Sequence, residues 1–305
     1  MKCVLYIVYC FAILKSILVL SNGNPFIGYN VKQAESYEFD FIVSISRKNY
    51  AKMSLEEDYH ICGGALITTT HVLTSAHCEC EGSVDLEDYT VKVGHDLRNP
   101  EANFSISTWN SYQKCCCSLF RRGNMCNDIS VITLFDDIYS KITREIVLPV
   151  LNYSPIEQLY NKNATSAGWG DGINMLHPRY MLKVTMRTIS KEECQRNIDM
   201  APIVVGVNDK YRSKRKRIIK NNTLCSNGNP VPGVIPYTTL GGGDSGSPLM
   251  IGNNEIIAIN TGVFPPESPE YYAYQQSLHV TFLAHREFIE RQLKNANEIG
   301  CFGRK

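Results

Sequence analysis

Short apolar or alternating runs separated by turn residues recur along most of the chain. Runs of this kind predict β-strands, and many short strands at close spacing are typical of an all-β barrel or sandwich. Strands that alternate with helical patterns do not occur, which argues against a doubly wound parallel sheet. We expect strands at residues 39–46, 64–68, 90–93, 129–135, 181–188, 248–251, 255–259 and 277–282.

The end of the chain has a helical pattern instead. Phe288, Ile289 and Leu293 lie among charged residues at helical spacing, which predicts an amphipathic helix over residues 284–297. We expect this helix to pack against a second barrel. The two halves of the chain would then each form a barrel, with the join near residues 135–155.

The N-terminus indicates secretion. Lys2 gives a basic start, an apolar stretch interrupted by Lys15 follows, and the small residues Ser21 and Gly23 come next. This order is typical of a secretory signal, which we place at residues 1–23, with a pro-segment of two further residues. The charge within the apolar stretch disfavours a membrane span. An uncleaved signal anchor is the alternative.

The overall charge gives no reason to expect a nucleic acid or an anionic membrane as a partner. The 31 basic and 30 acidic residues leave a net charge of +1, so no long-range field favours a polyanion. The local exception is a basic run at residues 210–217, followed by Lys220. We interpret this run as a solvated loop open to proteolysis, with a heparin-like or membrane contact as the alternative.

The cysteines and glycosylation sequons agree with secretion. Twelve cysteines are typical of an oxidising compartment, where disulfides persist. Ten of them remain once the signal is removed. Asn-x-Ser/Thr sequons predict a glycosylated surface. They lie at Asn103, Asn152, Asn163 and Asn221.

The most specific string is Gly-Gly-Gly-Asp-Ser-Gly-Ser-Pro at residues 241–248. A nucleophilic serine needs a tight turn that exposes its hydroxyl and directs backbone N–H groups at a developing oxyanion, and glycines permit this close approach. Ser245 is therefore a candidate nucleophile. A simple glycine-rich turn is the alternative.

A serine hydroxyl also needs a base. His77 in Ala-His-Cys is a suitable base because the ordinary pKa of histidine lies near physiological pH. Asp128 in Asn-Asp-Ile precedes a buried strand and would orient the imidazole. A structural or zinc-binding role for His77 is the alternative, although Cys78 and Cys80 have no partners at metal-site spacing.

These three motifs, in this order, resemble the chymotrypsin/trypsin family of secreted serine proteases. The Ala-Gly-Trp-Gly segment at 167–170 also looks like a family strand. The resemblance implies two six-stranded antiparallel β-barrels packed together with a C-terminal α-helix. It places the peptidase domain at residues 26–300 and a tail at 301–305. It further implies that His77, Asp128 and Ser245 form a catalytic triad.

By the same resemblance, the backbone N–H groups of Gly243 and Ser245 form the oxyanion hole. Two residues depart from the family pattern here. Ser247 stands where the family usually has glycine, and Gly241 replaces a cysteine that ties this loop to the opposite pocket wall. The second change removes a constraint on the specificity pocket.

The primary specificity pocket can be carried over by position. Thr239 would be its floor and Gly262 and Ser277 its walls, with Asn260 at the start of an Asn-Thr-Gly segment that takes the place of the family's Ser-Trp-Gly. Members that cleave after basic residues have an aspartate at the floor. The resemblance therefore implies cleavage after apolar or aromatic residues. A pocket blocked by the proline-rich insertion at 265–269 is the alternative.

The resemblance also implies two disulfides, Cys62 with Cys78 and Cys194 with Cys225. Six further mature cysteines allow 15 pairings, which the sequence cannot distinguish. They are Cys80, Cys115, Cys116, Cys117, Cys126 and Cys301.

Activation in the family depends on a newly released N-terminal amine that binds the aspartate before the catalytic serine, here Asp244. Phe26 matches the new terminus, and no Lys or Arg lies between Lys15 and Phe26 for a trypsin-like activator. Signal cleavage after Gly23 would leave Asn-Pro ahead of Phe26. We expect an aminopeptidase that removes X-Pro dipeptides to complete maturation.

Two functions fit these features. The first is a secreted extracellular endopeptidase that hydrolyses peptide bonds through an acyl-enzyme. The second is an inactive homologue that acts as a binding cofactor in an extracellular cascade, which retention of the whole triad disfavours. We expect a monomer with protein or peptide substrates and with protease inhibitors as partners. We expect no cofactor, no metal ion, no nucleic acid and, after signal removal, no membrane.

Overall fold

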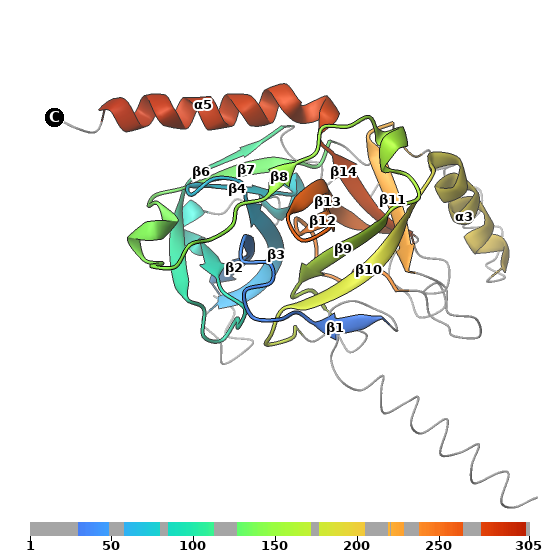
Figure 1. Ribbon diagram of the computed structural model, residues 1–305, viewed down its shortest axis with the longest axis horizontal. Helices are drawn as coiled ribbons and strands as arrows, with labels where there is room; N and C mark the ends of the chain where they lie inside the picture. The colour runs from blue at the N-terminus through green and yellow to red at the C-terminus, as the bar shows by residue number, and fades with distance from the viewer. Residues whose placement is uncertain are drawn as a thin grey trace, which may run out of the picture.

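The structure is a computed structural model (Figure 1). It describes residues 30–48, 58–79, 85–112, 127–171, 177–204, 219, 221–228, 238–264 and 276–302. The signal segment, Phe26, the basic run and the proline-rich insertion lie outside these residues.

Six antiparallel strands close the first barrel in the order β2-β3-β4-β7-β6-β5 (Figure 1). These strands are β2 (Ile42–Lys48), β3 (Asp58–Leu66), β4 (His71–Thr74), β5 (Tyr89–Val93), β6 (Ala102–Ser111) and β7 (Ser130–Leu134). Pairing of β2 with β5 closes the ring.

The second barrel follows in the sequence. Its strands run in the order β10-β11-β14-β13-β12-β9, and pairing of β9 with β10 closes it. They are β9 (Asn163–Gly168), β10 (Leu182–Ile189), β11 (Thr223–Gly228), β12 (Pro248–Ile251), β13 (Glu255–Phe264) and β14 (Gln276–Thr281). Two short strands join from outside, β1 (Val31–Gln33) on β10 and β8 (Val150–Leu151) on β13. The predicted pair of six-stranded antiparallel barrels is confirmed.

Alternation along the strands builds a core that continues from one barrel into the other. In β5, Tyr89, Val91 and Val93 are buried while the residues between them are partly exposed, as expected when side chains alternate between the two faces of a strand. One buried cluster includes Val91 of the first barrel together with Trp169 and Ile259 of the second. This shared core fixes how the two barrels face each other.

The C-terminal helix lies on the first barrel, not the second. Helix α5 (Arg286–Phe302) follows a short 3-10 turn, η6 (Leu283–His285), and runs above β6 and β7 (Figure 1). Its Phe288 ring packs edge-on against Tyr112, next to the end of β6, at 5.4 Å. The prediction of the helix is confirmed, but its expected packing against the second barrel was wrong. The apolar face of a helix does not indicate which part of the protein it packs against.

Among the described residues, the other α-helix is α3 (Lys191–Val204), which the sequence pattern did not reveal. The 3-10 turns of the described residues also include η1 (Ala76–Glu79), η2 (Leu86–Asp88), η3 (Ile138–Ser140) and η4 (Ile156–Leu159). Within the described ranges, no helix combines the length and the apolar character needed to cross a membrane.

Candidate active site

His77 and Asp128 meet at the end of the first barrel. His77 lies in η1, directly after β4, and Asp128 lies two residues before β7. Because β4 and β7 pair, their ends are neighbours. The Nδ1 atom of His77 is 2.7 Å from Oδ2 of Asp128, and the backbone N–H of His77 donates to Oδ1 at 2.8 Å. The carboxylate thus fixes both the ring and the turn that carries it.

Asp128 is a buried carboxylate that remains ionised. Only 1% of it is exposed. Burial alone would raise its pKa, but the charge of His77 and hydrogen bonds from His77 and Thr261 lower that pKa below its usual value. The Thr261 hydroxyl donates to Oδ2 from β13 of the second barrel. Asp128 therefore receives donors from both barrels.

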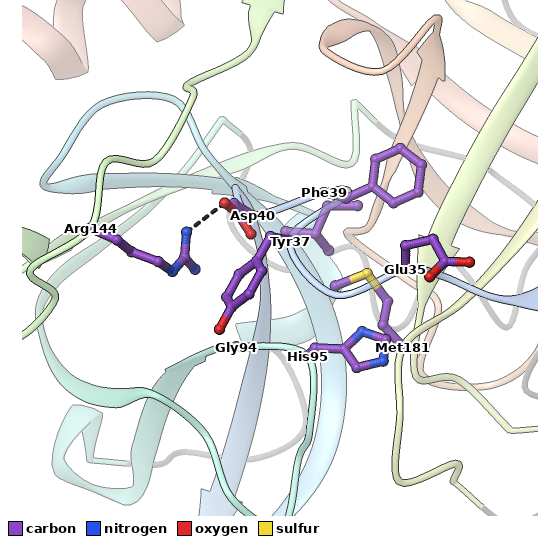
Figure 2. Close-up of a pocket in the computed structure, with 9 residues that line it drawn as sticks. Glu35, Tyr37, Phe39, Asp40, Gly94, His95, Arg144 and Met181 are labelled. Carbon is purple, nitrogen blue, oxygen red and sulfur yellow. Dashed lines mark hydrogen bonds and ion pairs between the residues drawn. The ribbon is translucent and has the colours of Figure 1, made fainter.

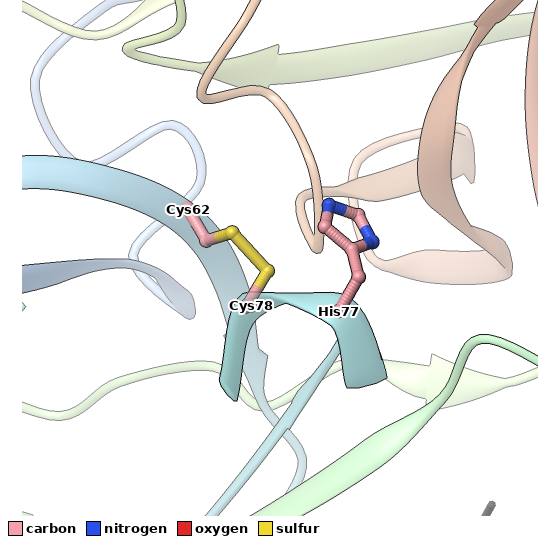
Figure 3. A group of neighbouring side chains, drawn as sticks. All are labelled: Cys62, His77 and Cys78. Carbon is pink, nitrogen blue, oxygen red and sulfur yellow. A yellow bond between two sulfur atoms is a disulfide. The ribbon is translucent and has the colours of Figure 1, made fainter. Parts of the chain in front are cut away.

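A disulfide beside His77 excludes a metal site at this position. Cys62, His77 and Cys78 lie close together (Figure 3), with their potential ligand atoms within 4.8 Å of one another. Cys62 and Cys78 are joined at an S–S distance of 2.03 Å, so neither sulfur is available as a thiolate ligand. The bridge ties the histidine turn to β3 instead.

Ser245 lies on a loop of the second barrel that touches the first. The N–H of Gly63 in β3 donates to the Ser245 carbonyl at 2.8 Å, and Cys78 Sγ lies 4.0 Å from the same oxygen. The structure therefore brings Ser245 against the turn that carries His77. Gly246 has φ of +81°, and a Cβ atom there would lie 2.2 Å from Thr74 Oγ1. Only glycine fits this position.

The expected oxyanion loop is held by hydrogen bonds from several directions. Gly243 has φ of +88°, and Nε2 of the buried His60 lies 3.0 Å from its carbonyl oxygen. A carbonyl oxygen can only accept, so His60 Nε2 carries a proton. Burial, with a smaller contribution from His177, lowers the pKa of His60 to about 3. The ring is therefore neutral near pH 7.

Asp244, which precedes the serine, is completely buried. Its Oδ1 accepts from Gly170 N at 3.0 Å, and its Oδ2 accepts from Gly241 N at 2.9 Å. Gly241, which replaces a cysteine of the family pattern, thus takes part in holding this carboxylate. The expected amine partner, Phe26, lies outside the described residues.

The predicted floor and one predicted wall of the specificity pocket lie in direct contact. Thr239 Oγ1 is 3.1 Å from Ser277 Oγ, and both residues are completely buried. The Leu240 N–H also donates to Ser277 Oγ at 3.2 Å. Gly262 lies at an irregularity in the pairing of β13 with β14. Asn260 is completely buried beneath the serine loop, and its side-chain nitrogen donates to the Asp244 carbonyl.

The other residues singled out from the sequence have varied surroundings. Ser247 is buried, and its hydroxyl has no hydrogen-bond partner among the described residues. Cys194 and Cys225 are joined at 1.98 Å and tie α3 to β11. Asn103, Asn163 and Asn221 are exposed and Asn152 is half-buried. Five of the six unassigned cysteines lie outside the described residues, as does the side chain of the sixth, in α5.

Several contacts of the site were not foreseen. The roles of Thr261 and His60 come from pairing across the barrels, and no sequence spacing predicts them. His177 is a third case, because its Nδ1 lies 3.2 Å from Asp171 Oδ1 and its ring lies edge-on to His60 at 5.3 Å. For His60, the only available signal was a histidine two residues before a predicted disulfide cysteine.

A small, partly open pocket lies elsewhere, between the segment that precedes β2 and the residues Gly94, His95, Arg144 and Met181 (Figure 2). None of the predicted catalytic residues lines it. Its guanidinium group, Arg144, already pairs with Asp40 and with Glu101. It is therefore a weaker candidate than the histidine–aspartate site.

Comparison with known proteins agrees with this geometry. A family model described as Trypsin matches residues 29–282. A trypsin from Phaedon cochleariae is 26% identical over 77% of this chain and 79% of its own. A chymotrypsin from the same species is 29% identical over 69% and 66%. The clotting factor G beta subunit of Tachypleus tridentatus is 27% identical over 63% of this chain and 58% of its own length, so the chain spans little more than half of that relative.

Proposed function

Because the chain belongs to the trypsin family of serine proteases, we propose that it is a catalytically active endopeptidase with Ser245 as its nucleophile. The observation that carries this proposal is the 2.7 Å contact between His77 Nδ1 and the buried Asp128 carboxylate. An acceptor at Nδ1 keeps the proton on that nitrogen, so Nε2 is unprotonated and can act as a base.

In the proposed reaction these residues act in sequence. Ser245 Oγ attacks the peptide carbonyl carbon while its proton passes to His77 Nε2, and the carbonyl oxygen becomes an oxyanion. The backbone N–H groups of Gly243 and Ser245 stabilise this charge. The C–N bond then breaks, the amine leaves with the proton from His77, and an acyl-enzyme remains. Water, deprotonated by the same histidine, releases the acid and restores the serine.

The primary pocket is proposed to accept apolar or aromatic side chains. Thr239 and Ser277 offer neutral hydroxyls that are already bonded to each other, so no carboxylate is available at these positions to pair with Arg or Lys of a substrate. Relatives named trypsin and chymotrypsin both match the chain, so the similarity itself does not select a preference. Membership of the trypsin family supports a protein substrate.

Secretion and maturation are part of the same proposal. The two disulfides of the described residues fit an oxidising compartment. Asp244 is a buried carboxylate beside the oxyanion loop, which supports the Phe26 amine as its counter-charge. N-terminal sequencing of the secreted protein, combined with active-site titration, tests this step. Full reactivity in material that still begins at Asn24 would overturn it.

The proposed activity is tested by hydrolysis of a denatured protein substrate. The secreted wild-type protein should cleave it, and Ser245→Ala or His77→Ala should lower the rate by several orders of magnitude, because triad members act as one unit. Normal secretion and circular dichroism of both variants provide the control for folding. If Ser245→Ala retained the parent activity, Ser245 would not be the nucleophile.

A further inference from the structure

The direction of an oxyanion-hole donor is set by the rest of its peptide group. The N–H of Ser245 belongs to the same planar unit as the carbonyl of Asp244, and in a trans peptide the two groups point in opposite directions. Whatever holds the Asp244 carbonyl from behind therefore aims the Ser245 N–H. We propose that Asn260 is the positioning residue that does so, an inference that rests on the proposed function.

Asn260 is bonded to the serine loop through its side chain and its backbone. Its Nδ2 donates to the Asp244 carbonyl at 3.2 Å and to Ser166 Oγ at 2.8 Å. Its own N–H donates to Ser247 O at 2.9 Å, and its carbonyl accepts from Gly246 N at 2.8 Å. Asn260 is completely buried, so water does not compete for these contacts.

The backbone carbonyl of Asp244 determines which atoms donate and which accept in the hydrogen bonds of Asn260 and His279. The Asp244 oxygen can only accept, so the amide nitrogen of Asn260 must face it. Asn260 Oδ1 then faces His279 Nδ1, at 2.9 Å, which must carry the proton. His279 Nε2 is left as an acceptor for the Ser226 hydroxyl at 2.8 Å. The amide of Asn260 is thus fixed in one orientation from both sides.

His279 suits this role because it is neutral. The ring is completely buried, and burial lowers its pKa to about 3. A neutral imidazole with its proton on Nδ1 holds the Asn260 oxygen without placing a second charge near Asp244. A chain of hydrogen bonds thus leads from Ser226 in β11 through His279 in β14 and Asn260 in β13 to the backbone carbonyl of Asp244. None of the three side chains in it is ionised.

The second oxyanion donor has a matching arrangement. The N–H of Gly243 shares its peptide group with the Gly242 carbonyl, and that carbonyl accepts from the backbone N–H of Asp171. Each of the two donor N–H groups is therefore held in position through the carbonyl of its own peptide group. At Gly243 the holding group is backbone, which substitution does not remove. At Ser245 it is the side chain of Asn260, which substitution does remove.

A hydrogen bond at the Asp244 carbonyl also strengthens the donor. Hydrogen bonds that share a peptide group polarise one another, so donation from Asn260 makes the Ser245 N–H a better donor to the oxyanion. Ser247 N also donates to the Asp244 carbonyl, at 3.2 Å, but that contact is formed within the same turn. Asn260 is the contact that ties this carbonyl to the barrel.

The test is the second-order rate of inactivation by diisopropyl fluorophosphate, which needs no knowledge of the preferred substrate. Asn260→Val keeps the approximate volume but removes the donor, and it should react about 10- to 100-fold more slowly than wild type, since loss of one oxyanion donor costs about 10²- to 10³-fold. Asn260→Asp places an acceptor opposite the Asp244 carbonyl and should react at least as slowly. His279→Phe releases Asn260 Oδ1 and provides a second variant that should also react more slowly.

The matched control is Thr188→Ala, which removes a buried hydroxyl of β10 that donates to Leu159 O at 2.7 Å and lies outside this chain of hydrogen bonds. It should lower the melting temperature but leave the inactivation rate within about twofold of wild type. The pH at which the acid limb of the inactivation profile is half-maximal should not move in Asn260→Val, because that substitution leaves the contacts of His77 and Asp128 in place. If Asn260 had only a structural role, Asn260→Val and Thr188→Ala would both react more slowly, each in proportion to its loss of stability.

The outcomes separate this inference from the proposed function. An unreactive wild-type protein would overturn both. A reactive wild type with Asn260→Val within about twofold of it would overturn the positioning role alone. A shifted acid limb in Asn260→Val would also overturn it, because the residue would then act through the triad. Slow reaction of folded Asn260→Val with normal reaction of Thr188→Ala would support it.

Discussion

At the scale of single residues, burial has two opposite uses in this site. Asp128 is buried and ionised, because three donor contacts from His77 and Thr261 offset the loss of water. His60 and His279 are buried and neutral, with the pKa of each lowered to about 3. The charged group orients the base, whereas the neutral groups hold backbone and side-chain carbonyls around the serine loop.

The residue that tests the pocket is Thr239. Thr239→Asp would place a carboxylate within reach of the Ser277 hydroxyl, its present partner at 3.1 Å. A charge there pairs with a cationic substrate side chain, so cleavage after Arg and Lys should rise at least tenfold relative to cleavage after Phe. Mass spectrometry of a digested peptide library measures this ratio. Thr239→Asn is the neutral control and should not raise it, and a wild-type preference for Arg would contradict the proposed pocket.

At the scale of elements, β3 packs directly on the serine loop. A Cβ atom at Gly63 would lie 1.9 Å from Ser247 Oγ and 3.0 Å from Ser247 Cβ. The glycine in the strand and the serine in the loop are therefore fitted to each other. This contact, together with the bond from Gly63 N to Ser245 O, positions the loop of one barrel on a strand of the other.

A double-mutant cycle tests that fit. Gly63→Ala should lower the free energy of unfolding by about 1–3 kcal/mol, because it overpacks a closed contact. Ser247→Gly removes the two atoms nearest to the new methyl group and leaves only the Cα of residue 247 close to it, at 3.1 Å, so the double variant should recover more than half of the loss. Denaturant titration of the four proteins gives the coupling energy, expected at about 1 kcal/mol or more. Additive effects of the two substitutions would mean that the two residues do not meet.

The sequence predicted elements better than contacts. The bounds of β12, at 248–251, matched, but β6 was missed although Phe104 and Ile106 alternate with exposed residues, and so was α3. The triad residues could be recognised because each lies within a short motif of consecutive residues, Ala-His-Cys, Asn-Asp-Ile or Gly-Asp-Ser-Gly. The sequence did not show that Asn260 and Thr261 have different roles. Neighbouring residues of a strand face opposite sides, but the structure is needed to show that Asn260 faces Asp244 and Thr261 faces Asp128.

At the scale of the whole molecule, buried neutral histidines make stability depend on pH. The pKa of His60 and of His279 is about 3 in the folded protein, against about 6.5 in an unfolded chain. Between these values the unfolded state binds more protons, so stability is full above pH 6.5 and falls as the pH decreases toward 3. The slope is up to about 1.4 kcal/mol per pH unit for each histidine.

Urea unfolding at pH 5 and pH 7 measures this dependence. The free energy of unfolding should fall by about 4 kcal/mol between pH 7 and pH 5 from these two residues together. The control is His60→Gln, which removes one titrating group and should remove about half of that change. Equal stability of the wild type at the two pH values would show that these histidines are not buried in the neutral form.

The most direct test of the account is to find which atom reacts with an active-site probe. A fluorophosphonate should label the mature wild-type protein at one residue, and peptide mapping by mass spectrometry should place the label on Ser245. Ser245→Ala should take no label, and His77→Ala should take it far more slowly because the base is gone. Labelling of another residue, or no labelling of folded and matured protein, would contradict the assignment of Ser245 as the nucleophile.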